Sequence, residues 1–198
     1  MPQVIGGASL QVSVLGEVHI EADQPRQRAR GLISACAWLA LHPGATGPQM
    51  DRALGMSAES RTSTISRLRA WLGAEVVPLA PGRYRIYAWT DWSRFCALVC
   101  EPSGRLSVTT SDEDLVDALQ LVRGEPLADV DAGWAEADRL SMALLIADVS
   151  GLLVRRRLER GQLCGALWSL SRGLTAFPGH PDLVEMLAAL RTRTVGAA

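Results

Sequence analysis

Residues 46–73 read TGPQMDRALGMSAESRTSTISRLRAWLG, and this stretch decides the fold of the first half of the chain. Thr46 is a residue type that caps helix N-termini, and Pro48 suits a first turn, where its missing N–H loses no hydrogen bond. Gly55 directly follows Leu54 and can adopt the left-handed conformation that ends many helices. The pattern therefore predicts a short helix that begins after Thr46 and runs to about Leu54.

A second helix is predicted directly after this one. Either Ser57 or Ser60 can cap its N-terminus, and the helix continues to about Leu72 and ends at Gly73. The connection between the two helices is only a few residues long, as a compact helix-turn-helix requires.

This second helix has a buried side and a polar side when its residues are spaced by about 100° per position. The buried side is defined by Ile65, Leu68, Trp71 and Leu72. The opposite side shows Glu59, Ser63, Ser66 and Ala70, with Thr62 and Arg67 flanking it and Arg61 and Arg69 nearer the core edge.

The segments before the helix pair predict one β segment and one helix. Residues 10–20 (LQVSVLGEVHI) alternate apolar with polar or small residues, and Gly16-Glu17 interrupts them, which indicates a pair of short strands or one bent strand. Residues 26–42 carry apolar side chains at helical spacing and predict a first helix, which Pro43-Gly44 ends.

The segment after the helix pair predicts a hairpin. Residues 75–88 (EVVPLAPGRYRIYA) place two apolar arms around the turn residues 80–83. Residues 91–99 then predict a short helix that closes this first module.

From Ser111 onward the pattern is almost purely helical. Ser111 begins a capping box, and residues 124–126 (GEP) interrupt the helix that follows it. Further helices are predicted over residues 134–159, 163–177 and 181–193. The apolar stripe of the longest one consists of Leu140, Leu144, Leu145, Val149, Leu152 and Leu153.

Composition limits what the chain can do. The 198 residues are 48% hydrophobic and 21% charged, which suits a globular protein whose core needs no disulfide or metal. All 20 basic residues are Arg. Residues 1–95 carry a net charge of +3 and residues 96–198 a net charge of −4, so one part suits an anionic polymer and the other suits protein partners.

The sequence does not point to an enzyme. It lacks a phosphate-binding glycine loop, a nucleophile elbow and a zinc-protease motif. The acidic run 112–114 lies where a helix begins, and acidic residues there interact favourably with the helix dipole. The Cys and His residues are scattered, so neither a metal site nor a cofactor is expected. No signal peptide or membrane-spanning run is visible, and we expect a reducing, cytoplasmic location.

The order of these segments resembles one family of transcription regulators, the SARP-type regulators. They combine a winged helix of the response-regulator type with a bacterial transcriptional activator domain. In the first half the resemblance rests on residues 14–16 (VLG), 39–44 (LALHPG), 65–69 (ISRLR) with 72–73 (LG), and 81–85 (PGRYR). In the second half it rests on residues 123–127 (RGEPL), 131–134 (DAGW), 161–174 and 181–185 (PDLVE). It covers almost the whole chain, and the order of the motifs makes it specific.

This resemblance implies an α+β fold. A winged helix-turn-helix domain would occupy residues 8–100, and an all-α, tetratricopeptide-like helical domain would occupy residues 108–194. A winged helix binds double-stranded DNA by laying its third helix in the major groove while the hairpin touches the backbone or minor groove. The residues expected to contact DNA are Thr62, Ser63, Ser66, Arg67, Arg69, Arg83 and Arg85.

Two functions stay open at this point. The first is a DNA-binding transcription regulator whose helical domain mediates oligomerisation or contact with RNA polymerase or an adjoining domain. The second is a protein-interaction or signalling module that does not bind DNA, because the Glu59 carboxylate would repel phosphate. Such a module could be the cytoplasmic part of a larger protein. Leu183, Leu187 and Leu190 either cap the helical stack or form an exposed edge that dimerises. Residues 155–157 (RRR) are either a solvated run or a docking patch.

Overall fold

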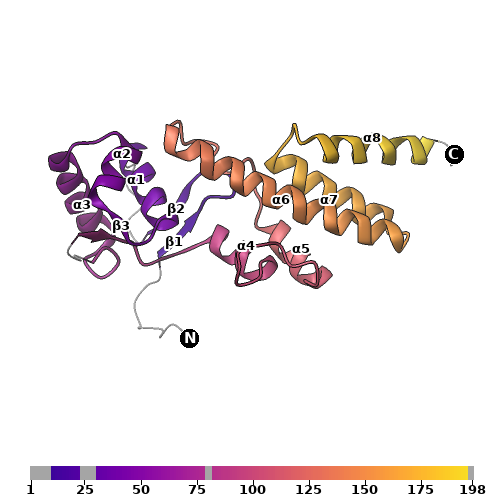
Figure 1. Cartoon of the computed structure of the whole chain (residues 1–198), viewed down its shortest axis with the longest axis horizontal. Coiled ribbons are helices and arrows are strands. Elements are labelled where there is room, and N and C mark those ends of the chain that lie inside the picture. The colour runs from indigo at the N-terminus through magenta and orange to yellow at the C-terminus, as the bar shows by residue number, and fades with distance from the viewer. Residues whose placement is uncertain (1–9, 23–29, 79–81, 196–198) are drawn as a thin grey trace. The chain divides into compact units, whose positions relative to one another are not determined.

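The computed structural model describes residues 10–22, 30–78 and 82–195, with side chains up to residue 192. These residues are mostly helical with a small amount of sheet, which agrees with an α+β fold (Figure 1). They form two compact units: residues 10–13 and 18–90 belong to the first, and residues 14–17 and 91–195 to the second. No helix in the described ranges is both long enough and apolar enough to cross a membrane.

The first unit contains a three-stranded sheet in the order β2-β1-β5. The central strand β1 (Leu10–Ser13) pairs antiparallel with β2 (His19–Glu21), which confirms the prediction of two short strands. It pairs in parallel with β5 (Ala88–Thr90), and α1 (Arg30–Leu41) packs against β5. Leu10 and Val12 are buried on one face of the sheet.

The helices α2 (Gly47–Leu54) and α3 (Ala58–Leu72) form where the sequence predicts them. Gly55 ends α2 in the left-handed region with a φ of 60°. Ser57 rather than Ser60 caps α3, because the Ser57 Oγ accepts a hydrogen bond from the Ser60 N–H at 3.2 Å. The short turn between these caps fixes where the two helices meet.

The hairpin predicted over residues 75–88 forms only in part. Residues 74–77 form a turn and bend. The Val77 N–H donates to the Gly73 carbonyl at 3.2 Å, so it is not available for a hydrogen bond to the opposite strand of a hairpin. Among the described residues, a bond from the Tyr87 N–H to the Val76 carbonyl at 2.8 Å joins the two arms. β4 (Arg83–Tyr84) pairs instead with β3 (Ala45–Thr46). The turn residues 79–81 lie outside the described residues.

The division between the units lies one helix earlier than the sequence predicts. α4 (Asp91–Val99) was expected to close the domain of residues 8–100, but it packs against α5 (Asp112–Gln120) in the second unit. The buried Asp91 carboxylate accepts the backbone N–H groups of Val14 at 2.7 Å and Leu15 at 3.0 Å. These two bonds bring residues 14–17 into the second unit.

The rest of the second unit is built from three further helices. α6 (Gly133–Glu159) and α7 (Leu163–Ala176) lie side by side, and α8 (Pro181–Val195) packs on both (Figure 1). The Ser150 hydroxyl of α6 donates to the Ser169 carbonyl of α7 at 2.7 Å, and both residues are fully buried. The three helices share one apolar core.

The apolar stripe predicted for α6 is correct only in its second part. Val149 and Leu153 are fully buried, whereas Leu140 and Leu144 are 52% and 43% exposed. The buried face of the first part is centred on Ala135, Met142, Ala143 and Ile146. The packing of the neighbouring helices, rather than side-chain hydropathy alone, therefore selects the buried face of this part of α6.

Candidate nucleic-acid interface

The polar face predicted for α3 is exposed. Ile65 is 4% exposed and Leu68 is fully buried, and these two side chains fix the rotation of the helix. The exposed side chains opposite them are Glu59, Thr62, Ser63, Ser66, Arg67 and Ala70. The helical spacing of the sequence therefore predicted the orientation of α3 correctly.

Three residues of this face can donate hydrogen bonds outward. The side chains of Ser63, Ser66 and Arg67 make no hydrogen bond or ion pair with another described residue. Thr62 differs, because its Oγ1 donates to the Ala58 carbonyl at 3.0 Å and only its lone pairs remain to accept a bond. Hydroxyl and guanidinium groups placed in this way can bind base edges or phosphate oxygens.

Two further arginines of α3 hold the helix in place. Arg61 forms an ion pair with Asp51 of α2, and its guanidinium carbon lies 5.8 Å from the centre of the Tyr84 ring. Arg69 donates a hydrogen bond to the Val77 carbonyl. Both side chains are half-buried, as their places near the core edge predicted. The sequence predicted that Arg69 contacts DNA, but in the structure its guanidinium binds the segment that follows α3.

The two arginines of the predicted hairpin are exposed. The Arg83 Nη1 donates to the Gly44 carbonyl at 3.0 Å, and the Arg85 guanidinium carbon lies 5.7 Å from the centre of the Tyr87 ring. A guanidinium has five N–H donors, so each of these contacts leaves others able to reach an anion.

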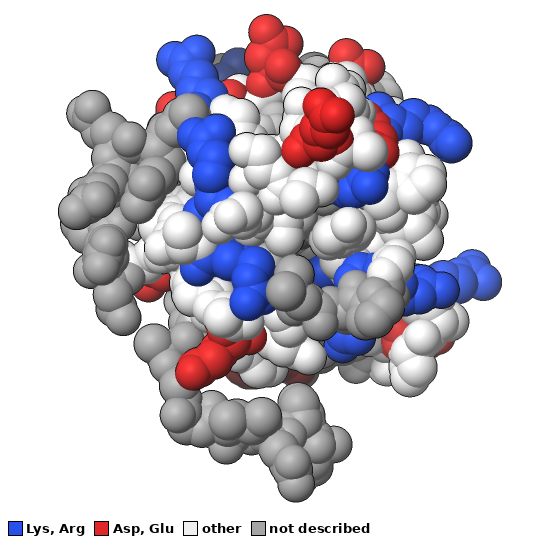
Figure 2. All heavy atoms as spheres, turned by 90° about the vertical axis from the view of Figure 1, so that its left-hand side faces the viewer, with Lys and Arg blue, Asp and Glu red and all other residues white. Residues whose placement is uncertain are grey.

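The charge of the first unit is positive but dispersed. Figure 2 shows the side of the molecule on which α1, α2 and α3 lie, and its blue and red groups are interspersed with uncharged surface. The described charged residues of this unit are Arg30, Arg52, Arg61, Arg67, Arg69, Arg83 and Arg85 against Glu21, Asp51, Glu59 and Glu75, a net charge of +3. A field of this size steers a polyanion only weakly.

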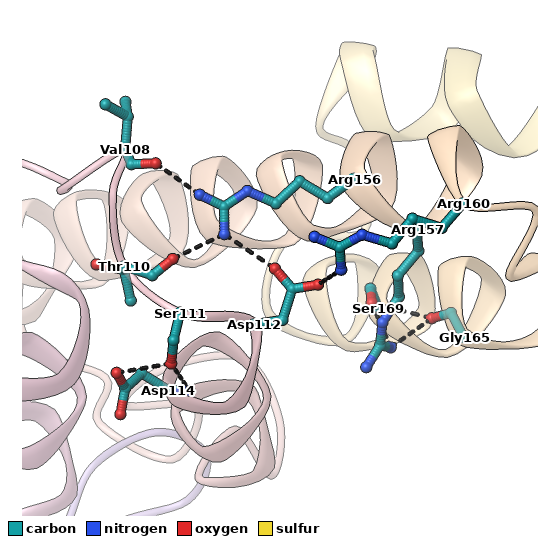
Figure 3. A network of polar contacts seen from close by, with 10 residues as sticks. All are labelled: Val108, Thr110, Ser111, Asp112, Asp114, Arg156, Arg157, Arg160, Gly165 and Ser169. Atoms are coloured by element: carbon teal, nitrogen blue, oxygen red, sulfur yellow. Dashed lines mark hydrogen bonds and ion pairs between the residues drawn. The ribbon is translucent and has the colours of Figure 1, made fainter.

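The second unit contains a polar network that the sequence does not reveal (Figure 3). Arg156 donates to the Thr110 carbonyl at 2.7 Å and to Asp112 Oδ1 at 2.9 Å, and it also reaches the Val108 carbonyl. Arg160 forms an ion pair with the other oxygen of the same carboxylate. The network therefore ties the segment before α5 to the last turns of α6.

Arg157 extends toward α7 instead (Figure 3). It donates to the Gly165 carbonyl at 2.7 Å and to Ser169 Oγ at 3.0 Å, and its guanidinium carbon lies 5.4 Å from the centre of the Trp168 ring. Of the three arginines in the run 155–157, two thus make internal contacts and only Arg155 is exposed. The run is neither a solvated face nor a continuous docking patch.

Neutralising Asp112 is expected to cost stability at neutral pH but not in acid. Burial would raise the pKa of Asp112, yet the hydrogen bonds from Arg156 and Arg160 outweigh it and hold the pKa below its ordinary value of 3.8. A carboxyl with a depressed pKa in the folded state stabilises the fold above its unfolded pKa and loses this contribution as pH falls through the folded pKa.

We therefore expect Asp112→Asn to lower the thermal unfolding temperature at pH 7, and the difference from wild type to shrink as pH falls below about 4. Circular dichroism melts across this pH range measure it. Asp117→Asn on the exposed side of α5 is the control and should show no such trend. If the difference in unfolding temperature between Asp112→Asn and wild type stays constant down to the lowest pH, the ion-pair explanation is wrong.

The leucines expected at an exposed partner edge pack within the second unit instead. Leu183 and Leu190 are 1% and 2% exposed, and Leu187 is half-buried. All three pack into the core formed with α6 and α7. They cap the helical stack, which was the other interpretation of the sequence, because their apolar face turns toward α7 rather than toward solvent.

One pocket among the described residues lies in the second unit. A pocket of about 350 Å³ is lined by Glu125, Ala128, Asp129, Val130, Asp131, Ala132, Glu136 and Arg139, and Arg139 donates to three carbonyls of that loop. No group of three or more His, Cys, Asp or Glu among the described residues is placed to hold a metal ion. Burial raises the pKa of Cys36 to about 12 and is the largest cause that raises the pKa of Cys96 to about 12, so both thiols are protonated and poorly nucleophilic at neutral pH.

No model of a known protein family matches the chain, and no curated protein matches its sequence.

Proposed function

We propose that the chain is a DNA-binding transcription regulator. In this proposal the first unit is a winged helix that lays α3 in the major groove of double-stranded DNA, and the second unit is a tetratricopeptide-like domain. The observation that carries it is the face of α3, where Ser63, Ser66 and Arg67 are exposed and bind no other described residue. A helix that follows a short turn, is anchored through Ile65 and Leu68 and carries such donors meets the requirements of a recognition helix.

Arg83 and Arg85 complete the proposed interface as phosphate ligands. Both are exposed and retain donors beyond the contacts they make within the chain. The second unit would contact a second copy, RNA polymerase or an adjoining domain, and no small-molecule cofactor is needed for any of these roles.

One observation favours a second candidate function, a protein-interaction or signalling module that does not bind DNA. Glu59 is exposed in the first turn of α3, where a DNA phosphate would otherwise approach the helix N-terminus. The charges on this side of the molecule are also interspersed rather than gathered into one basic patch (Figure 2).

Binding to duplex DNA at several salt concentrations distinguishes the two functions. We expect the wild type to bind a labelled random-sequence duplex and to lose affinity steeply between about 50 and 200 mM salt, because each neutralised phosphate releases counterions. Arg67→Ala is expected to weaken binding about five- to tenfold, the effect of losing one base or phosphate contact of about 1 kcal/mol. Fluorescence anisotropy measures both.

Arg155→Ala is the matched control, because Arg155 is also exposed on a helix but lies on α6. It should bind as the wild type does. Absence of wild-type binding at the lowest salt would overturn the DNA-binding function and leave the interaction module. Equal losses for Arg67→Ala and Arg155→Ala would show that α3 is not the DNA-contacting element.

A further inference from the structure

Two aromatic side chains of the first unit are exposed outside α3. Tyr87 is 56% exposed and Trp89 is 62% exposed, and no other large hydrophobic side chain in the described part of this unit is exposed. A fully buried aromatic side chain removes roughly 150–250 Å² from water, and more than half of each of these side chains is still exposed. Two exposed rings so close in sequence therefore offer apolar surface to a binding partner.

The sheet places these rings on one surface. Trp89 pairs with Gln11 of β1, which pairs in turn with Glu21 of β2, and all three side chains are exposed on the face opposite Leu10 and Val12. Burial alternates along the segment, since Ile86 and Thr90 are buried while Tyr87 and Trp89 are exposed. Tyr87 directly precedes β5, and the same alternation favours a projection of its ring to the side on which Trp89 lies.

The surroundings of the rings are cationic and polar rather than apolar. The guanidinium carbon of Arg85 lies 5.7 Å from the centre of the Tyr87 ring. Arg83, two residues before Arg85, is exposed. Residues 76–90 contain no acidic residue. The one acidic group of the row, Glu21, lies two strands away from Trp89, at about 9.6 Å. The hydrophobic core of a protein interface would need further apolar neighbours, which Gln11 and Arg85 do not supply.

We propose that Tyr87 and Trp89 form a stacking platform for the unpaired bases of a single-stranded nucleic acid, with Arg83 and Arg85 contacting its phosphates. Aromatic rings that stack on successive bases, combined with cationic side chains along the backbone, bind single strands with little sequence preference. A duplex hides its base faces and cannot use this platform. The inference goes beyond the proposed function, because Tyr87 and Trp89 lie outside α3, although it shares Arg83 and Arg85 with the proposed duplex interface.

The experiment compares two labelled oligonucleotides of equal length, oligo-dT and an abasic strand with the same phosphates, in titrations of the full chain at low salt. We expect oligo-dT to bind and the abasic strand to bind much more weakly. Tyr87→Ala and Trp89→Ala should each weaken oligo-dT binding at least about fivefold, the lower end of the cost of losing one base–aromatic stack. Tyr87→Phe and Trp89→Phe keep a ring and should bind close to wild type.

Trp89→Leu serves as a second variant if the alanine variants do not fold, because it keeps apolar bulk but has no ring. Trp89→Leu should also weaken oligo-dT binding at least about fivefold, the loss expected for Trp89→Ala. Equal binding of oligo-dT and the abasic strand, or equal binding of the Leu and Phe variants, would overturn base stacking. Self-association that Trp89→Leu abolishes, with no oligo-dT binding, would assign the rings to a second copy instead. Arg67→Ala should leave oligo-dT binding unchanged, so a failure of this inference and a failure of duplex binding through α3 are separate results.

Discussion

Asp91→Ala is expected to destabilise the second unit by about 3 kcal/mol or more. Asp91 Oδ1 accepts the N–H groups of Val14 at 2.7 Å and Trp92 at 2.9 Å, and Oδ2 accepts that of Leu15 at 3.0 Å and an Arg123 N–H at 3.1 Å. Each buried donor left without an acceptor costs about 1–3 kcal/mol, and Arg123 also loses its counter-charge.

Urea denaturation combined with amide hydrogen exchange measures the loss of stability in the second unit specifically. The exchange of α6 amides reports the free energy of unfolding of the second unit, and that of the Val14 and Leu15 amides reports the local bonds. Asp91→Asn keeps the shape and one acceptor, so we expect an intermediate loss. Asp148→Ala on the exposed side of α6 is the control. If Asp91→Ala is as stable as wild type, the carboxylate does not hold residues 14–17.

The second large effect is expected from Gly173→Ala. A Cβ at this position would lie 2.5 Å from Ser150 Oγ and 2.7 Å from both Ser150 Cβ and Leu183 Cδ1, all within the packed core of α6, α7 and α8. Ala normally favours a helix interior over Gly by about 1 kcal/mol. Overpacking of a closed core costs about 1–3 kcal/mol and relaxation here must move a buried hydrogen-bonded serine. We expect a net loss of up to about 2 kcal/mol.

Gly133→Ala provides the matched control for this substitution. Gly133 is the first residue of α6 in the same unit, and a Cβ there meets no atom within 4 Å. We expect this variant to be neutral or slightly more stable in thermal and urea unfolding. Equal effects of the two substitutions would mean that α7 has room to shift away from α6 at residue 173.

Local chemistry explains which elements the sequence predicted well. The ends of α2 and α3 follow from Thr46, Gly55, Ser57 and Gly73, because caps act on backbone groups within one turn of the residue that supplies them. The rotation of α3 follows from the spacing of Ile65 and Leu68 for the same reason, since helical geometry converts spacing directly into a face.

The candidate sites were predictable only in part. The exposure of Thr62, Ser63, Ser66 and Arg67 follows from helical spacing, whereas the contact of Arg69 with Val77 depends on how the chain turns after α3. The exposure of Tyr87 and Trp89 was not predicted, because a strand pattern does not say which face the core covers. That was decided when β5 paired with β1, far away in sequence.

The sequence by itself determined the two adjacent helices α2 and α3, the long helix α6 and the polar face of α3, all of which depend on residues within a few turns of one another. Only the tertiary structure decided that Asp91 binds residues 14–17, that Arg156 and Arg157 make internal contacts, and that Leu183 and Leu190 are core residues. The physical reason is the same in each case. A side chain of this kind can bind solvent, a partner or a distant backbone group, and the spacing of residues along the sequence does not show which. The packing of segments that are remote in sequence determines it.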